Sequence, residues 1–277
     1  MGFITTRDGI NLHVKDSGVG PAVLLIHGWP LTGDMWEYQT LALQEAGYRV
    51  ITYDRRGFGQ SSHPIGPYDY DTLAEDLATI INTLELSDVT LVGFSMGGGE
   101  VARYLSRHGS ALVRSTVLIS TVLPGLMRSS ANPDGIDFEL IAEMKSSIRK
   151  DRFHFLRQFM RTFYGVSTLF HPVSDAILDW SFLLAVMASP MATLECVEAW
   201  GTTDFTADMP AFAGVPTLVI HGTDDSCVPV EISSARTAQL IPHARFTTYE
   251  SAPHGVFASH HEQLNSDLLG FLGARSV

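Results

Sequence analysis

The sequence predicts an α/β protein with a mostly parallel eight-stranded sheet, flanking helices and a helical insertion between two of the strands. Short β-rich runs alternate with longer segments of helical periodicity, which is typical of a parallel sheet covered by helices. Several of the short runs are continuously apolar, as in strands that are buried on both faces. One stretch, residues 124–212, carries helical patterns and no strand signal.

The expected strands are short, and the first two of them flank Asp8-Gly9, a dipeptide that favours a tight hairpin turn. The run at Ala22–Ile26 is the clearest of the buried type. In chain order the expected strands are Ile4–Thr6, Leu12–Lys15, Ala22–Ile26, Arg49–Tyr53, Val89–Val92, Thr116–Ile119, Thr217–Ile220 and Arg245–Tyr249.

Helices are predicted where apolar residues recur at helical spacing. Those between strands are Asp71–Leu86, Met96–His108 and Glu231–Leu240, and those within the insertion are Phe138–Ile148, Phe153–Phe163, Val173–Met187 and Met191–Ala199. No segment rich in Pro, Gly or Ser separates two domains. We therefore expect one domain over residues 1–277, with residues 124–212 forming a helical cap over the sheet.

The composition argues against several classes of protein. Eighteen Lys and Arg against 30 Asp and Glu give a net charge of −12, and an acidic surface repels nucleic acid and anionic membranes. A hydrophobic fraction of 45% over 277 residues is enough for a large core and excludes disorder. The uncharged stretches Ser115–Met127 and Trp180–Leu194 are shorter than the roughly 18 residues of a membrane-spanning helix.

The cysteines and the N-terminal segment predict the compartment. Cys196 and Cys227 are too few for a disulfide framework or a four-ligand zinc site. The Met1–Asp8 segment lacks the apolar region of a secretory signal. These features favour reduced thiols and a cytoplasmic location, and they are compatible with a homo-oligomer.

The sharpest motif is Gly93-Phe94-Ser95-Met96-Gly97, which follows an expected strand and opens an expected helix. This is the G-x-S-x-G nucleophile elbow in the strand–turn–helix context that it requires. The motif predicts that Ser95 is a nucleophile.

A nucleophilic serine needs a base, and the base needs an acid that orients it. Asp224 and Asp225 follow the strand Thr217–Ile220, and His254 follows the strand Arg245–Tyr249, in the order serine, acid, histidine. These are positions where open α/β sheets hold their active groups. We expect His254 and one of the two carboxylates to complete a triad with Ser95.

An oxyanion hole is expected from backbone N–H groups. His27-Gly28-Trp29-Pro30 follows the strand Ala22–Ile26, so the N–H groups of Trp29 and Met96 are the candidate donors. Pro30 has no N–H, and it biases the preceding residue away from helical geometry. We expect Pro30 and Phe94 to lie beside the bound substrate.

These segments resemble those of the α/β hydrolases called cofactor-free haloperoxidases, a group that includes arylesterases and perhydrolases. The resemblance is carried by His27–Pro30, Tyr53–Ser61 and Gly93–Tyr104, and it extends over essentially the whole chain. It implies the α/β-hydrolase fold, and it places the nucleophile on Ser95, the acid on Asp225 and the base on His254.

The resemblance also implies the reaction. We expect hydrolysis of small carboxylic esters through an acyl-enzyme, without metal or organic cofactor, and peracid formation when hydrogen peroxide replaces water. In that case the resemblance implies that Pro30 and Phe94 also adjoin the peroxide, and we expect the Pro30 carbonyl to accept a hydrogen bond from it. A lactonase, a lactamase or a carbon–carbon bond hydrolase would use the same triad. A ligand receptor that retains the triad but turns over slowly is the alternative from another class.

Other conspicuous residues are interpreted as structural. Asp54–Gly57 is expected to form a turn with charge pairs, and His221 to make a structural hydrogen bond. His260 and His261 are expected to be solvated, and Cys227 to be an inert thiol. The aromatic and Met side chains of the 124–212 segment are expected to lie mostly in the core, and some of them are expected to shape an apolar pocket. They are Phe138, Phe155, Phe159, Trp180, Phe182 and Met187.

Overall fold

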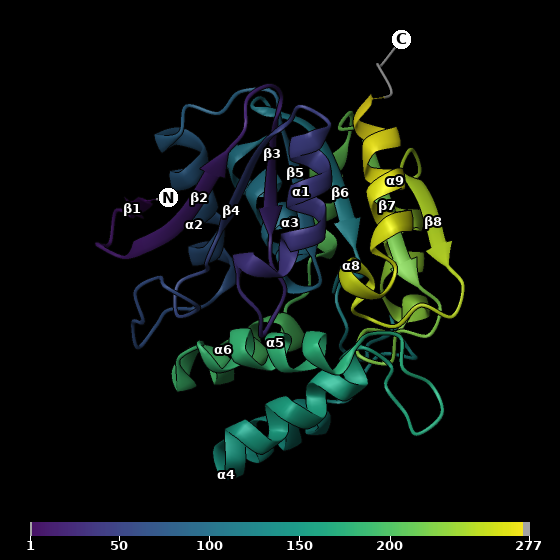
Figure 1. The fold of residues 1–277 in the computed structure, drawn as a ribbon. Coiled ribbons are helices and arrows are strands. Elements are labelled where there is room, and N and C mark those ends of the chain that lie inside the picture. The colour runs from purple at the N-terminus through teal and green to yellow at the C-terminus, as the bar shows by residue number, and fades with distance from the viewer. Residues whose placement is uncertain (1, 274–277) are drawn as a thin grey trace.

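The sheet organises the computed structural model, which describes residues 2–273 (Figure 1). Within them, eight strands pair in the order β1-β2-β4-β3-β5-β6-β7-β8. The β1–β2 and β2–β4 pairs are antiparallel, and every other neighbouring pair is parallel. The strands are β1 (Gly2–Thr5), β2 (Asn11–Ser17), β3 (Ala22–Ile26), β4 (Arg49–Tyr53), β5 (Val89–Phe94), β6 (Val113–Ile119), β7 (Thr217–Gly222) and β8 (Arg245–Tyr249). The prediction of a mostly parallel eight-stranded sheet is confirmed.

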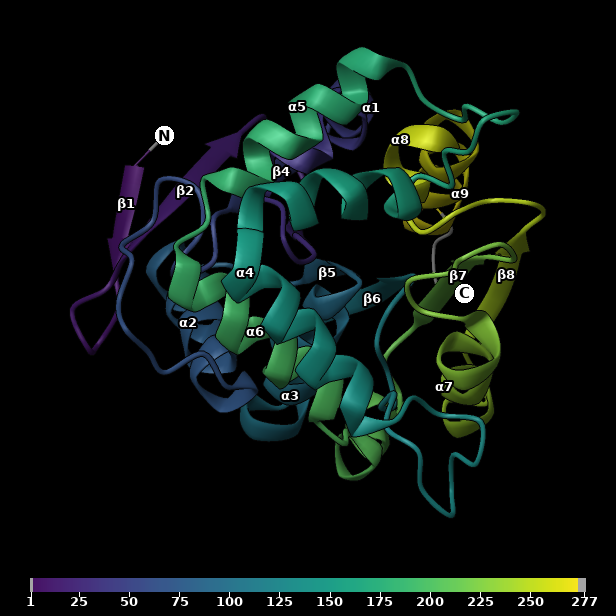
Figure 2. The same ribbon diagram turned by 90° about the horizontal axis from the view of Figure 1, so that it is seen from below.

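Helices cover both faces of this sheet (Figures 1 and 2). On one face lie α1 (Glu37–Glu45), α8 (Val256–Ser259) and α9 (His261–Gly273), and on the other lie α2 (Tyr70–Thr83), α3 (Met96–His108) and α7 (Ser234–Leu240). The central strands β3 and β5 are therefore enclosed on both sides, which explains their unbroken apolar sequence.

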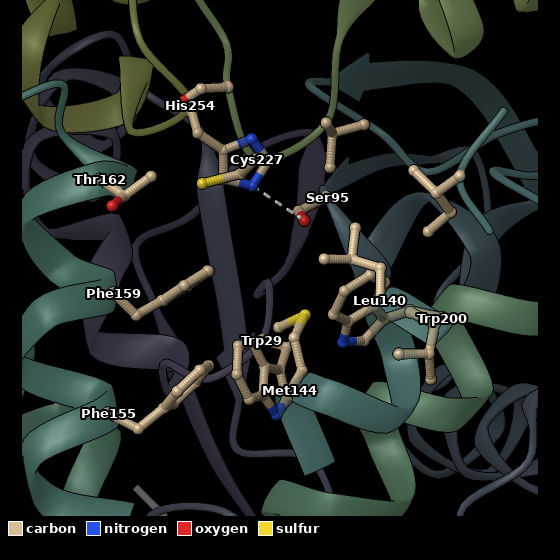
Figure 3. A pocket seen from close by; sticks show the side chains of 14 residues that line it. Trp29, Ser95, Leu140, Met144, Phe155, Phe159, Thr162, Trp200, Cys227 and His254 are labelled. Carbon is tan, nitrogen blue, oxygen red and sulfur yellow. Dashed lines mark hydrogen bonds between the residues drawn. The ribbon is translucent and has the colours of Figure 1, made fainter. Parts of the chain in front are cut away.

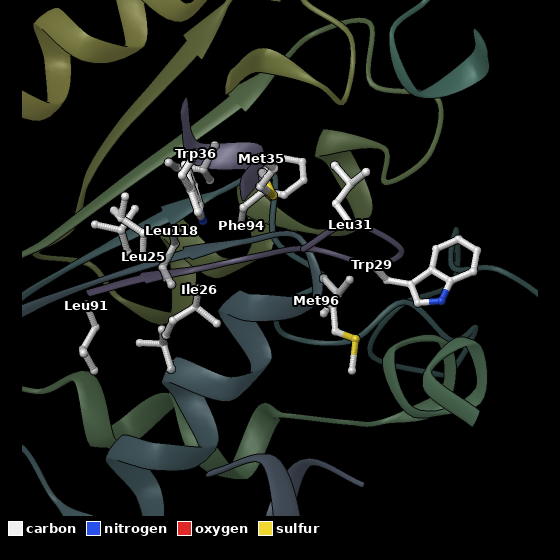
Figure 4. Close-up of a cluster of buried hydrophobic side chains, with 14 of the residues drawn as sticks. Leu25, Ile26, Trp29, Leu31, Met35, Trp36, Leu91, Phe94, Met96 and Leu118 are labelled. Carbon is white, nitrogen blue, oxygen red and sulfur yellow. The ribbon is translucent and has the colours of Figure 1, made fainter. Parts of the chain in front are cut away.

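Side chains from the central strands and the adjoining loops fill the core between these layers (Figure 4). Leu25 of β3 and Phe94 of β5 lie on one face of the sheet, and Ile26 of β3, Leu91 of β5 and Leu118 of β6 lie on the other. All five side chains are buried. This core fixes the carboxyl ends of β3 and β5 side by side, and both ends lead into functional loops.

Three helices lie across the carboxyl end of the sheet: α4 (Phe138–Phe163), α5 (Asp175–Val186) and α6 (Pro190–Thr202) (Figure 1). The α4 helix is kinked at Asp151, whose φ of −159° and ψ of 89° are not helical. The Asp151 carboxylate accepts a hydrogen bond from the His154 N–H at 2.9 Å and so caps the second half of the helix. The sequence predicts two separate helices here, Phe138–Ile148 and Phe153–Phe163, and they correspond to the two halves of α4.

Some short elements differ from the predictions. The predicted helix Glu231–Leu240 is a 3₁₀ turn, η3 (Val230–Ile232), followed by α7. The helix α1 and the 3₁₀ turn η1 (Gly33–Trp36) lack a clear apolar stripe and were not predicted. The 3₁₀ segment η2 (Thr206–Phe212) packs against α3, so the end of the 124–212 segment contacts the sheet-covering layer.

The prediction that His260 and His261 are solvated is wrong. Both side chains are half-buried. The His260 ring stacks on Tyr249 at a centroid distance of 6.3 Å, and the His261 ring stacks on Tyr38 at 4.2 Å. Aromatic neighbours supplied by other elements cover these rings, and no local sequence pattern indicates them.

Within residues 2–273, no single helix is long and apolar enough to cross a membrane. The helices α5 and α6 reach that length and composition only together, and they are bent by 99° relative to each other.

Candidate active site

The nucleophile elbow lies between β5 and α3. Ser95 has a φ of 52° and a ψ of −118°, a backbone region that residues other than glycine rarely occupy. The strand and the helix approach so closely that a Cβ on Gly93 would lie 2.7 Å from the carbonyl oxygen of Gly97. Glycine at position 93 is therefore a packing requirement of this turn.

Ser95, His254 and Asp225 form a hydrogen-bonded chain. The His254 Nε2 atom lies 3.0 Å from Ser95 Oγ, and its Nδ1 atom lies 2.6 Å from Asp225 Oδ2. A carboxylate only accepts hydrogen bonds, so the network assigns the proton to Nδ1. Nε2 is then free to accept the Ser95 hydroxyl proton. The three side chains come from the ends of β5, β7 and β8 and are buried together.

The surroundings of Asp225 keep it ionised. Its Oδ1 atom accepts hydrogen bonds from the backbone N–H groups of Cys227 at 2.9 Å and Val228 at 2.8 Å. Burial by itself raises the pKa of a carboxyl, but interactions with His254 and His221 outweigh it and hold the pKa of Asp225 well below its usual range. The neighbouring Asp224 side chain is exposed to solvent.

His221 is a further member of this cluster. Its Nδ1 atom lies 2.7 Å from Ser234 Oγ, and its Nε2 atom lies 2.8 Å from the Val228 carbonyl oxygen and 3.0 Å from Asp225 Oδ2. The predicted structural hydrogen bond of His221 is confirmed. Its contact with Asp225 was not predicted, because it depends on how the loop after β7 folds back on the strand.

The backbone N–H groups of Met96 and Trp29 are the expected oxyanion donors. Met96 is the first residue of α3, so its N–H has no acceptor within the helix. Trp29 lies in the loop after β3, and within residues 2–273 neither N–H donates to another backbone carbonyl. A Cβ on Gly28 would lie 2.6 Å from the Phe94 ring and 3.1 Å from Ser95 Cβ, so only glycine lets this loop approach the elbow. Both N–H groups are available as hydrogen-bond donors.

A buried polar network holds the loop after β3. The Arg55 N–H donates to His27 Nε2 at 2.9 Å, and the Arg55 guanidinium donates to the His27 carbonyl oxygen at 2.6 Å and pairs with Glu100 of α3. Burial and the Arg55 charge lower the pKa of His27, so its imidazole stays neutral. The expectation of a structural turn with charge pairs over Asp54–Gly57 is confirmed.

A cavity of about 220 Å³ opens onto Ser95 and His254 (Figure 3). Its walls are mostly apolar and come from the loop after β3, from α4 and α6, and from the loop after β7. The lining residues are Trp29, Ser95, Ile136, Leu140, Ile141, Met144, Phe155, Phe159, Thr162, Trp200, Ser226, Cys227, Val228 and His254. The predicted pocket residues Phe155 and Phe159 are among them. Phe138 and Met187, which are 52% and 42% exposed, instead face solvent.

Pro30 and Phe94 do not line this cavity. The Phe94 ring is fully buried and packs against the His254 ring at a centroid distance of 4.9 Å, on the side of the core. Pro30 is buried next to Trp29. Their expected positions beside the substrate stay predictions. The Phe94 ring supports the His254 imidazole.

Cys227 lines the cavity, and its side chain is half-buried. Burial, together with the nearby Asp225 charge, raises the pKa of the thiol well above its usual value, in agreement with the expectation of an inert thiol. Within residues 2–273, no group of three or more His, Cys, Asp or Glu side chains is arranged to hold a metal ion.

Comparison with known proteins identifies the family. The family model described as the alpha/beta hydrolase fold matches residues 21–260. The chain belongs to this family. Among the relatives of this α/β hydrolase, a non-heme chloroperoxidase of Kitasatospora aureofaciens is 42% identical over 98% of this chain and 99% of the relative.

Two further similar proteins extend the comparison. A bifunctional esterase/perhydrolase of Acinetobacter calcoaceticus is 36% identical to this α/β hydrolase over 98% of its chain and 99% of the relative. The crystal structure of a bromoperoxidase from Bacillus anthracis superimposes with a TM-score of 0.93 at 45% identity, covering 96% of this chain and 97% of the other. The resemblance to haloperoxidases and perhydrolases is thereby confirmed.

Proposed function

We propose that this α/β hydrolase cleaves small carboxylic esters through an acyl-enzyme on Ser95, and that hydrogen peroxide competes with water to release a peracid. One observation carries the proposal: Ser95, His254 and Asp225 are joined by hydrogen bonds of 3.0 and 2.6 Å at the base of an apolar cavity. This is the geometry of a nucleophile, its general base and the acid that orients the base.

In the first half-reaction, Ser95 Oγ attacks the ester carbonyl while His254 Nε2 takes the hydroxyl proton. In this proposal the Trp29 and Met96 N–H groups, the predicted donors, hydrogen-bond to the resulting oxyanion. His254 then returns the proton to the leaving alkoxide oxygen, and the alcohol departs. Ser95 is left as an acyl ester.

The second half-reaction resolves this acyl ester. Water attacks the acyl carbonyl with His254 as base and releases the carboxylic acid. Hydrogen peroxide attacks in the same way and releases the peracid, with Ser95 regenerated in both cases. The names of the relatives, a non-heme chloroperoxidase and an esterase/perhydrolase, support the second route. Halide oxidation is then a reaction of the released peracid.

The cavity indicates the size and polarity of the substrate. Its volume of about 220 Å³ is below the roughly 300–1,000 Å³ of pockets for drug-sized ligands. Phe155, Phe159, Trp29 and Trp200 supply much of its wall. We therefore propose esters with a small apolar or aromatic group as substrates. A cytoplasmic location and a homo-oligomeric state stay predictions of the sequence.

The proposal is tested by Ser95→Ala with a p-nitrophenyl ester. We expect turnover to fall by several orders of magnitude, because the covalent route is lost, while the unfolding transition is retained. Ser106→Ala is the matched control, since Ser106 is an exposed serine on α3, the helix that follows Ser95. If Ser95→Ala keeps more than about a tenth of the wild-type rate, equal to a loss of only about 1.4 kcal/mol, Ser95 is not the nucleophile.

Two further measurements separate the remaining alternatives. Acid and peracid are quantified together at a fixed peroxide concentration, and the absence of peracid would limit the protein to ester hydrolysis. A panel of esters, lactones and lactams identifies the preferred bond, because these hydrolases share the triad and differ in pocket shape. A slow, single turnover with every substrate would favour a receptor.

A further inference from the structure

Met144 places a thioether in the cavity above Ser95. It extends from α4, is half-buried, and directs its sulfur toward the cavity between Trp29 and Trp200 (Figure 3). Cys227 is the second sulfur-bearing residue of the wall. Because the cavity is small, a product released from acyl-Ser95 passes close to these sulfur atoms before it reaches solvent.

A peracid released into the cavity is an oxidant of sulfur. The terminal peroxy oxygen of a peracid is electrophilic, and a thioether is a good acceptor of it. In the transfer, the peroxy O–O bond breaks and a sulfur–oxygen bond forms. The thioether is oxidised to the sulfoxide, and the peracid is reduced to the carboxylic acid, which retains the proton. Every atom of the step comes from Met144 and the peracid.

We infer that Met144 is a self-oxidation site, converted to methionine sulfoxide by the peracid that forms on Ser95, and that this conversion inactivates the enzyme. The inference rests on the peracid-forming part of the proposed function. The sulfoxide is a polar and bulkier group in a wall made of Trp29, Phe155, Phe159 and Trp200. It therefore opposes binding of the apolar substrates that the cavity admits.

Two features favour Met144 over Cys227 as the oxidised sulfur. Burial and the Asp225 charge raise the pKa of the Cys227 thiol, so the reactive thiolate is scarce at neutral pH. The thioether of Met144 needs no deprotonation before it reacts. Oxidation of Met144 therefore does not depend on ionisation of the sulfur-bearing side chain.

Other methionines of the chain provide internal references. Met187 and Met191 are 42% and 39% exposed, so a peracid arriving from bulk solvent reaches them readily. Met35 and Met96 are buried at 0% exposure and report any general loss of structure. Oxidation that starts inside the cavity is distinguished by an excess of Met144 sulfoxide over Met187 and Met191 sulfoxide.

The experiment compares two sources of the same oxidant. Wild-type enzyme turns over phenyl acetate with hydrogen peroxide, and Ser95→Ala receives peracetic acid at the concentration measured in the wild-type reaction. Sulfoxide is quantified at each methionine by peptide mass spectrometry. We expect the ratio of Met144 to Met187 oxidation to be roughly tenfold higher during turnover, because the peracid forms within the same cavity.

Equal ratios in the two samples, with peracid present in both, would overturn the inference and leave the proposed function intact. Absence of peracid in the wild-type reaction would overturn the inference together with the peracid-forming part of the proposed function, and would leave ester hydrolysis in place. Ester hydrolysis lost during turnover should return after treatment with the two methionine sulfoxide reductases, which do not repair oxidised tryptophan. If the reductases remove the Met144 sulfoxide and activity stays low, the inactivation is not caused by Met144.

A substitution adds a second readout. Met144→Leu removes the sulfur at nearly constant volume, and we expect about a several-fold rise in the number of peracid turnovers completed before activity is lost. Met187→Leu, on the exposed surface, is the matched control and should not extend that number. The quantity compared is the number of turnovers completed and not a rate, so a change in the initial rate of Met144→Leu does not affect the comparison. Equal counts in wild type and Met144→Leu would contradict the inference.

Discussion

Asp224 and Asp225 are adjacent carboxylates, and the structure separates their environments. Asp225 is buried against His254, whereas Asp224 is exposed. In Asp225→Asn the amide Nδ2 would donate a hydrogen bond to His254 Nδ1, and Nδ1 would have to accept it. The imidazole proton would then sit on Nε2, which could no longer take a proton from Ser95. We expect kcat to fall by about 10⁴-fold, as in a comparable triad.

Asp224→Asn is the control for this change, because it removes the same charge from the same loop. It should stay within about twofold of the wild-type kcat/KM, since the screened interaction of an exposed charge is small. Steady-state kinetics with one ester decides the matter. If Asp224→Asn is the impaired variant, the acid has been assigned to the wrong residue.

Individual side chains also mark the limit of local sequence patterns. The triad residues stand at the ends of three predicted strands, so their convergence follows from parallel strand topology. The contact of His221 with Asp225, and the position of Phe94 behind the imidazole, depend on loop geometry and core packing. No spacing in the sequence reports these contacts.

At the scale of elements, Gly97 determines how closely α3 approaches the end of β3. A Cβ at this position would lie 2.6 Å from the Ile26 carbonyl oxygen and 3.1 Å from that of His27. Gly97→Ala should therefore push the first turn of α3 outward, with the Met96 N–H, and cost about 1–3 kcal/mol of stability through overpacking. We expect kcat/KM to fall at the same time, because the proposed oxyanion donor is displaced.

Gly270→Ala is the matched control, because Gly270 lies exposed in α9 with nothing within 4 Å of the added Cβ. It should stabilise the protein by about 0.5–1 kcal/mol, since alanine loses less backbone entropy in a helix. Urea unfolding and ester kinetics on both variants check the pair. A stable and active Gly97→Ala protein would show that the elbow tolerates a Cβ.

Helices differed in how well they could be predicted. The α3 helix begins and ends at the predicted residues, because it follows the glycine-rich elbow and ends before Gly109. The α1 helix was missed, since its sequence carries almost no apolar periodicity and only Gln39 and Leu43 are buried. Packing against α9 stabilises α1, and that contact is not local in sequence.

At the scale of the whole molecule, Arg55 and Glu100 join three parts of the fold. Arg55 follows β4, contacts the loop after β3, and pairs with Glu100 of α3, and both side chains are inaccessible to solvent. Tyr53 donates a further hydrogen bond to Glu100 at 2.5 Å. Glu100→Gln leaves the Arg55 charge buried without its counterion, so we expect a loss of about 3–5 kcal/mol in unfolding free energy.

Glu75→Gln is the comparison, because Glu75 pairs with Arg107 on the surface, where both side chains are partly exposed. This variant should lose about 1 kcal/mol or less. Chemical denaturation of both variants provides the measurement. Similar losses in the two would mean that the buried pair contributes no more than a surface pair.

The sequence by itself determined the sheet, the order of its strands along the chain, and the identity of the nucleophile, acid and base candidates. These depend on local signals: apolar runs, the glycines around Ser95, and the positions of Asp225 and His254 after strands. Only the tertiary structure decided the cavity above Ser95, where Trp29, Met144 and Trp200 meet from distant segments. Its shape depends on side-chain packing between α4, α6 and the strand ends, and contacts between residues far apart in the chain leave no local pattern to read.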